Sequence, residues 1–110
     1  VDNIVRVRKT LVSDPEDPNN PYSPVFKNRR LPVMLLTARG DHGMDEGEEF
    51  AHINHLDPSM RTALGYIGLE EVYSIAIEYT AVGGAELDQS VEQALSQATR
   101  RAEQLFQELA

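Results

Sequence analysis

The sequence predicts an α/β fold with a parallel sheet, from two runs of strand length and a helical pattern after each. The first run, 31–38, is almost continuously apolar, and the second, 72–79, is rich in β-branched and aromatic residues. Each run is followed by a segment whose apolar residues recur every three or four positions. Strands that alternate with helices are typical of parallel sheets joined by right-handed crossovers.

The strand expected at 31–38 leads into a turn that contains two glycines. Apolar side chains on both sides of this strand indicate that both of its faces are covered, as in a central parallel strand. Pro32 is compatible with the strand because it lies near the start, where it removes no ladder hydrogen bond. The strand is expected to end before Arg39-Gly-Asp-His-Gly43, and residues 39–56 are expected to form a polar, acidic loop.

Two helices are expected in the second half of the chain. Asp57 is placed as the N-cap of the first helix, with Pro58 in its first turn and Gly68 as the C′ residue after it. The second helix follows Gly83 and Gly84 and is amphipathic over about six or seven turns. Its apolar face consists of Leu87, Val91, Ala94, Leu95, Ala98, Ala102, Leu105, Phe106 and Leu109.

The N-terminal third has a different pattern. Residues 1–11 carry apolar side chains at helical spacing and are expected to form the end of a helix. Prolines punctuate 13–24, so residues 13–30 are expected to form an irregular loop. Two strands are too few for a stable sheet of their own. We therefore expect residues 1–110 to be the C-terminal part of a single larger domain, with completion of the sheet by partner chains as the alternative.

The composition excludes several classes of protein. The 110 residues include no cysteine, which rules out disulfides, thiolate metal sites and a cysteine nucleophile. The net charge of −8 argues against binding to nucleic acid or to an anionic membrane, because both require an excess of Lys and Arg. No apolar run approaches the roughly 20 residues of a membrane span. No signal-peptide pattern opens the chain, so a cytoplasmic protein is expected.

Two motifs carry a resemblance to a known family. Thr37-Ala-Arg-Gly-Asp-His42 follows the first strand, and Leu64-Gly-Tyr-Ile-Gly-Leu69 ends the first helix. They resemble the Ser/Thr-x-Arg-Gly-Gly loop and the Leu-Gly-Phe-Ile-Gly-Ile helix end of flavodoxin-like NAD(P)H-dependent FMN oxidoreductases, in the azoreductase and quinone reductase branch. Asp41 stands where the family usually has a second glycine. The resemblance covers essentially the whole chain. It implies a flavodoxin-like three-layer α/β/α domain, of which this chain supplies about the last two strands and their helices.

The resemblance implies an FMN enzyme that takes hydride from NAD(P)H and passes two electrons to a quinone or azo compound. It also implies a homodimer with the flavin near the interface. A glycine-containing turn brings backbone N–H groups close to the polar edge of a flavin. A carboxylate at Asp41 would repel the reduced ring unless it turned outward. His42 is the candidate catalytic residue, and the cofactor-binding residues implied by the match are Thr37, Ala38, Arg39, Gly40 and Asp41.

Part of the family's binding machinery does not occur in these 110 residues. The loop that cradles the FMN phosphate is absent from the sequence, and so is the Pro-x-Tyr-Asn-Phe-type segment on the other side of the ring. We therefore expect this chain to hold FMN poorly by itself, and the intact protein to be the enzyme.

Two alternative functions stay open. On a helix, Glu48, His52 and His55 would share one face and could hold a metal, as in a metal-dependent hydrolase. Asn54 and Asp57 disfavour that helix, so a solvated loop is preferred and no metal ligand is assigned. The other alternative is a non-enzymatic flavodoxin-like dimerisation module. Packing roles, with the hydroxyl at the surface, are expected for Tyr66, Tyr73 and Tyr79.

Overall fold

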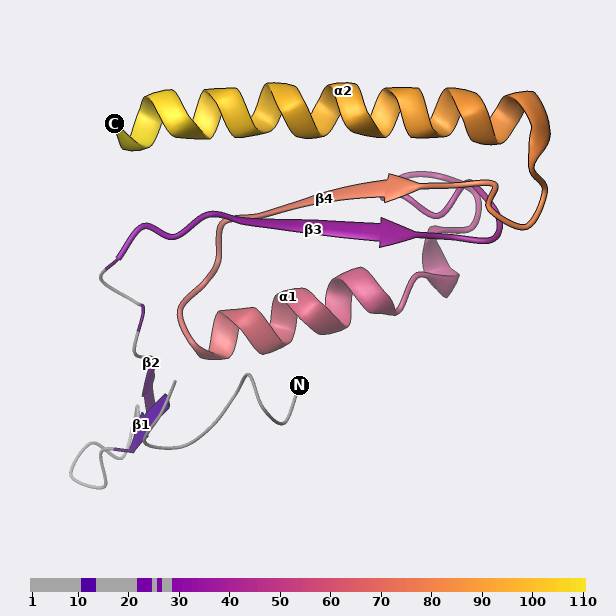
Figure 1. Ribbon diagram of the computed structural model, residues 1–110. Coiled ribbons are helices and arrows are strands. Elements are labelled where there is room, and N and C mark those ends of the chain that lie inside the picture. Colours follow the sequence, from indigo (N-terminus) through magenta and orange to yellow (C-terminus); the bar gives the residue numbers. More distant parts are fainter. Residues whose placement is uncertain (1–10, 14–21, 25, 27–28) are drawn as a thin grey trace. The chain divides into compact units, whose positions relative to one another are not determined.

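A computed structural model describes residues 11–13, 22–24, 26 and 29–110 of the chain (Figure 1). The chain divides into two compact units, which we call the first unit (Val1–Val33 and His55–Val72) and the second unit (Met34–Asn54 and Tyr73–Ala110). The helices and strands are β1 (Leu11–Ser13), β2 (Tyr22–Pro24), β3 (Val33–Ala38), the 3₁₀ helix η1 (Ala51–Ile53), α1 (Leu56–Tyr66), β4 (Val72–Ile77) and α2 (Gly84–Leu109).

The first unit contains a small antiparallel ladder between β1 and β2. Leu11 lies opposite Pro24 and Ser13 lies opposite Tyr22. Ser13 and residues 22–24 were expected to be irregular, and instead they belong to strands. Pro24 is tolerated there because it occupies a strand end, where a missing backbone donor costs little. Leu11 was expected to end a helix and instead belongs to β1. The rest of that expected helix end, residues 1–10, lies outside the described residues.

Helix α1 also belongs to the first unit, and it begins two residues earlier than an N-cap at Asp57 would require. Its N-cap is His55, so the prediction of Asp57 as N-cap is wrong. Asp57 instead lies in the first turn, where a carboxylate is favoured by the positive end of the helix dipole. The expected C-terminus is confirmed. Gly68 has a φ of 94° and donates to the Gly65 carbonyl oxygen, while Leu69 donates to that of Leu64, which is a Schellman motif.

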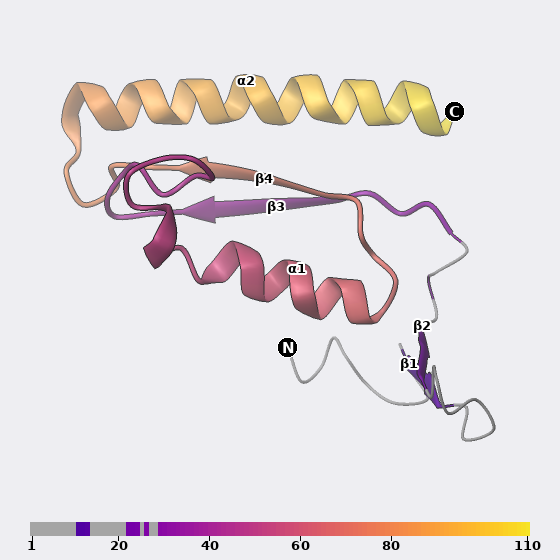
Figure 2. The same cartoon turned by 180° about the vertical axis from the view of Figure 1, so that it is seen from behind.

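The second unit contains most of a two-stranded sheet and one long helix. Strands β3 and β4 are neighbours and run in the same direction, which confirms the predicted parallel pairing (Figure 1). Helix α2 has 26 residues, as its amphipathic pattern predicts, and lies along β4 in both views (Figures 1 and 2). The Ser90 hydroxyl accepts a hydrogen bond from the Glu78 N–H at 2.8 Å, and the Arg101 guanidinium lies 4.2 Å from the centre of the Tyr73 ring. These contacts join helix to strand at two points.

The described residues of this chain leave part of β3 uncovered. Within β3, Leu36 is 64% exposed and Ala38 is also exposed. The physical reason is that β3 has only one neighbouring strand among the described residues, and one strand with one helix cannot cover every apolar side chain of a buried-type strand. In the same residues, no helix has the length and apolar character needed to cross a bilayer.

Candidate functional site

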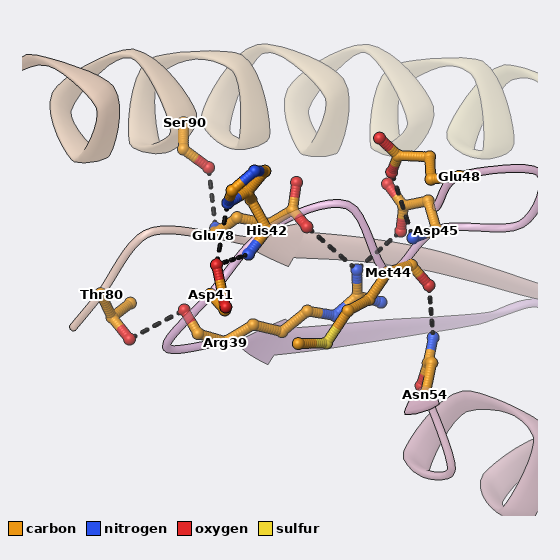
Figure 3. Close-up of polar contacts among 10 residues, drawn as sticks. All are labelled: Arg39, Asp41, His42, Met44, Asp45, Glu48, Asn54, Glu78, Thr80 and Ser90. Atoms are coloured by element: carbon orange, nitrogen blue, oxygen red, sulfur yellow. Dashed lines mark hydrogen bonds and ion pairs between the residues drawn. The ribbon is translucent and has the colours of Figure 1, made fainter. Parts of the chain in front are cut away.

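Two loops follow the carboxyl ends of β3 and β4 and meet at one edge of the second unit (Figure 3). We call residues 39–43 the β3 loop and residues 78–83 the β4 loop. Parallel strands end at the same edge of a sheet, which is why segments far apart in sequence are adjacent here. The Arg39 N–H donates to the Ile77 carbonyl oxygen (2.7 Å), and the Arg39 carbonyl oxygen accepts from both the N–H and the hydroxyl of Thr80 (3.0 and 2.8 Å). The Ala81 N–H donates to the Gly40 carbonyl oxygen (3.1 Å). The Tyr79 N–H donates to the Asp41 carbonyl oxygen (3.2 Å).

These bonds occupy the carbonyl groups of the β3 loop and leave donors without partners. Among the described residues, the backbone N–H groups of Gly40 and Asp41 donate no hydrogen bond. The Thr37 Oγ1, at the carboxyl end of β3, is buried and has no hydrogen-bond partner in the same set of residues. A buried polar atom without a partner is costly, so Thr37 Oγ1 marks a position where a ligand is expected, next to the N–H groups of the exposed residues Gly40 and Asp41.

The Arg39 side chain is occupied by carboxylates. Its Nη1 lies 2.8 Å from Asp45 Oδ1 and 3.5 Å from Glu78 Oε2, and only 9% of the side chain is exposed. The Asp45 backbone N–H donates a hydrogen bond to Glu48 Oε1 at 3.1 Å. Asp45, Glu48 and Glu78 form a carboxylate cluster with ligand atoms within 4.8 Å of one another. Because Arg39 lies against two of these carboxylates, it supplies the charge that balances the cluster.

The next residues of the β3 loop form a close pair. His42 Nδ1 lies 2.8 Å from Asp41 Oδ1, and the same oxygen accepts a hydrogen bond from the His42 backbone N–H at 2.9 Å. About half of the His42 side chain is exposed. The imidazole therefore combines a fixed carboxylate partner on one side with access to solvent on the other, which suits proton transfer or hydrogen bonding to a ligand.

Aromatic rings hold the His42 imidazole on two further sides. The Tyr79 ring is stacked on it, with centroids 4.8 Å apart and planes inclined by 9°. The Phe50 ring meets it edge-on at 6.3 Å. Tyr79 has a φ of 65°, the left-handed region that side chains other than glycine rarely adopt. Its carbonyl oxygen accepts hydrogen bonds from the Val82 and Gly83 N–H groups, so the conformation is held by the turn that follows.

Phe50 is anchored through Gly43. The Phe50 N–H donates to the Gly43 carbonyl oxygen at 2.8 Å, and a Cβ on Gly43 would lie 3.2 Å from the Phe50 ring. Gly43 also has a φ of 75°. A second contact joins the two ends of segment 44–54, because the side-chain amide of Asn54 donates to the Met44 carbonyl oxygen at 3.3 Å. The acidic loop expected at 39–56 is thus tied to itself by backbone contacts and contains the short helix η1.

The structure does not assemble the histidine metal site. Residues 51–53 form a 3₁₀ helix and the chain is extended at Asn54, so Glu48, His52 and His55 do not share a helix face. The described residues that could ligate a metal together are carboxylates and include neither histidine. The cause is the break at Asn54, which the sequence itself indicates because Asn favours turns over helix interiors.

The residues expected to bind a cofactor occupy one strand end and one turn. Thr37 and Ala38 are the last two residues of β3, and Arg39, Gly40, Asp41 and His42 form the turn after it. Tyr79 is the neighbour that sequence reasoning missed, since it was expected only to pack. Its position at the end of the second strand was the available signal, because the carboxyl ends of parallel strands lie together.

The chain is similar to a known protein family and to several named proteins. The profile of a family described as having a flavodoxin-like fold matches residues 1–102. A protein of Pseudomonas aeruginosa named FMN-dependent NAD(P)H:quinone oxidoreductase 1 is 36% identical over 94 residues, which are 86% of this chain and 43% of that protein. FMN-dependent NADH:quinone oxidoreductase 1 of Pseudomonas fluorescens is 33% identical over 110 residues, 100% of this chain and 47% of its own length.

A protein of Colwellia psychrerythraea named FMN-dependent NADH:quinone oxidoreductase 2 is 32% identical over 108 residues, covering 98% of this chain and 47% of that protein. The chain thus spans less than half the length of these curated relatives. The predicted α/β fold, the parallel strand pair and the family profile point to the same relationship. The chain belongs to the family of flavodoxin-like proteins.

Proposed function

We propose that this chain acts as the C-terminal part of an FMN-dependent NAD(P)H:quinone oxidoreductase. In the reaction, hydride from NAD(P)H passes through FMN, and two electrons reach a quinone or an azo compound. The observation that carries the proposal is the similarity to proteins with this name over nearly all of the chain, at 33% identity over 110 residues in one case. The main alternative is a non-enzymatic flavodoxin-like module, which the same similarity disfavours.

The residues at the carboxyl end of β3 fit an FMN ring. The N–H groups of Gly40 and Asp41 and the buried hydroxyl of Thr37 have no partner in the described part of the chain. These three groups would hold the polar edge of the isoalloxazine, which offers carbonyl oxygens and ring nitrogens. When bound, FMN supplies the two-electron chemistry. Donors at that edge stabilise the negative charge that the ring gains on reduction.

The side chains around these donors have separate tasks. Arg39 is committed to Asp45 and Glu78, so its contribution to the ring comes through the backbone of the loop. His42 stands beside the donors with about half of its side chain exposed, and is placed to hold or move a proton at Nε2. The Phe50 ring lies edge-on to the His42 imidazole, with the ring centroids 6.3 Å apart, and would limit the access of water from that side.

We propose further that residues 1–110 form the C-terminal part of one flavodoxin-like domain. Two apolar surfaces support this. Leu36 of β3 is exposed, and α2 presents Leu95, Phe106 and Leu109 to solvent on one face. The remaining part of such a domain would cover both surfaces and would add the FMN phosphate loop. A homodimer with flavin near the interface is part of the same proposal, and its mass in solution is measurable by light scattering.

The substitution Thr37→Val tests the FMN site, because it predicts two effects of opposite sign. Valine has the shape of threonine and removes only the unpartnered hydroxyl, so the flavin-free protein should become more stable, by about 1 kcal/mol. FMN affinity should fall about five- to tenfold, because the hydrogen bond to the ring is lost. Chemical denaturation measures the first effect, and quenching of flavin fluorescence measures the second.

Thr37→Ser is the matched control, since it keeps the hydroxyl and should keep FMN affinity within about twofold. The intact protein, natively purified, should also show the visible absorbance band of bound flavin. Intact protein that neither carries nor takes up FMN would contradict the proposal and favour the non-enzymatic module. Equal FMN affinity in both Thr37 variants would place the ring elsewhere.

A further inference from the structure

Asp41 makes contacts that a flavin ligand would not be expected to make. Its Oδ1 accepts two hydrogen bonds, one from the His42 backbone N–H and one from His42 Nδ1. The carboxylate therefore turns toward its neighbour in the chain and not toward the N–H groups left for the ring. In the resembling family a glycine usually stands here, and glycine has no side chain to make either contact.

The hydrogen bond from Nδ1 determines where the imidazole carries its proton. An ionised carboxylate only accepts hydrogen bonds, so a neutral His42 must bear its proton on Nδ1. Nε2 is then left with its lone pair and acts as an acceptor. If His42 takes up a second proton, that proton lies on Nε2, because Nδ1 already carries one.

The orientation of the ring is constrained from three directions. Asp41 holds its Nδ1 edge, Tyr79 covers one face by stacking at 4.8 Å, and the Phe50 ring lies against it at 6.3 Å. The backbone of Tyr79 is itself held by hydrogen bonds on both sides of its Cα. Its N–H donates to the Asp41 carbonyl oxygen, and its carbonyl oxygen accepts from the next turn. Asp41 thus supports the ring directly with its side chain and indirectly with its backbone.

We propose that Asp41 is a positioning residue that fixes His42 as the Nδ1–H tautomer and presents Nε2 as the proton-accepting and proton-delivering atom of the site. The use of Nε2 rests on the proposed function. There, the quinone would receive one hydride equivalent, which NAD(P)H supplies, and a protonated Nε2 would give one proton to the quinone oxygen. The hydride and the proton together convert the quinone into a neutral quinol, which leaves. Nε2 is then reprotonated from water, which restores the starting state.

The tautomer is measurable without flavin, by NMR of the full chain labelled with ¹⁵N at histidine. In the unsubstituted chain, with His42 neutral, Nδ1 should give the signal of a protonated ring nitrogen and Nε2 that of an unprotonated one. Asp41→Gly removes the acceptor, and His42 should revert to the Nε2–H tautomer that free histidine prefers. Asp41→Asn keeps an acceptor oxygen and should keep a larger Nδ1–H fraction than Asp41→Gly. His52 and His55 provide reference signals in every spectrum.

Tyr79→Phe and Tyr79→Ala separate the stacking from the carboxylate contact. Phenylalanine keeps the ring, so the His42 signals should stay in place, whereas alanine should broaden or shift them while the Nδ1–H tautomer persists. An Nε2–H tautomer in the unsubstituted chain would overturn the proposal. The proposal would also be overturned if the His42 tautomer were unchanged in Asp41→Gly while the signals of α2 showed that the chain is folded.

Activity and FMN binding in the intact protein distinguish this inference from the proposed function. A positioning role predicts that Asp41→Gly lowers kcat for quinone about tenfold while FMN affinity stays within about threefold. A large change in FMN affinity with unchanged kcat would instead make Asp41 a ligand of the ring and overturn the positioning role. Failure of the unsubstituted protein to bind FMN would remove the proposed function but would leave the tautomer result standing.

Discussion

Two arginine–carboxylate pairs of this chain have nearly the same shortest N···O distance, and the two arginines have very different surroundings. In the second unit, Arg39 Nη1 lies 2.8 Å from Asp45 Oδ1, and 9% of the arginine side chain is exposed. In the first unit, Arg30 makes a two-point contact with Glu71, each bond 2.9 Å long, and 45% of its side chain is exposed. Distance therefore does not distinguish the pairs, and burial does.

The difference shows which charges the fold depends on. A solvent-exposed ion pair is worth little, because water and salt compete with it. Removal of one member of a buried ion pair leaves the charge of the other member poorly solvated, which is costly. Glu78, with 17% of its side chain exposed, is such a dependent charge, since Arg39 is the cation beside it. The Arg39 pair thus lies where the β3 and β4 loops are joined, whereas the Arg30 pair lies at the surface.

The substitution Arg39→Ala should have the largest effect on this comparison. It removes a charged hydrogen bond to Asp45 and leaves Glu78 without its neighbouring cation, so the free energy of unfolding should fall by about 3 kcal/mol. Urea unfolding followed by circular dichroism measures the change. Arg39→Lys keeps the charge but loses the planar guanidinium, and should retain part of the stability. A loss no greater than that of Arg30→Ala would mean that burial does not separate the pairs.

A smaller effect is expected at Gly43, which shapes the segment that carries Asp45. Alanine there must adopt a φ of 75° and places its Cβ 3.2 Å from the Phe50 ring, so Gly43→Ala should destabilise by about 2 kcal/mol. Gly47→Ala is the matched control. Gly47 has a φ of 85° but nothing within 4 Å of its would-be Cβ, so only the backbone cost of about 1 kcal/mol applies. Equal losses in both variants would show that the Phe50 contact is irrelevant.

The smallest effect is expected from Arg30→Ala. An exposed pair, even with two-point geometry, contributes about 0.5 to 1 kcal/mol. This contribution should shrink as salt is added, whereas the loss in Arg39→Ala should change less, because Arg39 and Glu78 are largely buried and their attraction is screened less. Unfolding at low and high sodium chloride gives the comparison. A salt-independent loss at Arg30 would contradict the assignment of this pair to the surface.

Local patterns were sufficient for several elements. The helix α2 and the Schellman end of α1 depend on residues within a few positions of one another, and both were confirmed. The strands β3 and β4 followed from their composition. Asp57 as N-cap failed because Asp is also favoured in the first turn, so the same residue type fits two neighbouring positions. The exposure of Leu36 does not follow from any local pattern, because burial depends on neighbours far away in sequence.

The candidate site was predictable in its location and not in its contacts. The turn 39–43 could be singled out by its glycines and its place after an apolar strand. The commitment of Arg39 to Asp45 and Glu78, and the stacking of Tyr79 on His42, join segments separated along the chain. Asp41 and His42 are adjacent in sequence, yet their hydrogen bond depends on a rotamer and a turn that the Tyr79 backbone helps to hold.

Apolar spacing, proline and glycine placement and composition were enough to define an α/β chain with two parallel strands and a long final helix. These features act through local backbone preference and through the period of side chains along a strand or helix. Which charges are buried, which hydroxyl lacks a partner and which nitrogen of His42 carries the proton were decided only in the folded chain. Each of these depends on atoms that folding brings within hydrogen-bonding distance, and no local pattern encodes that distance.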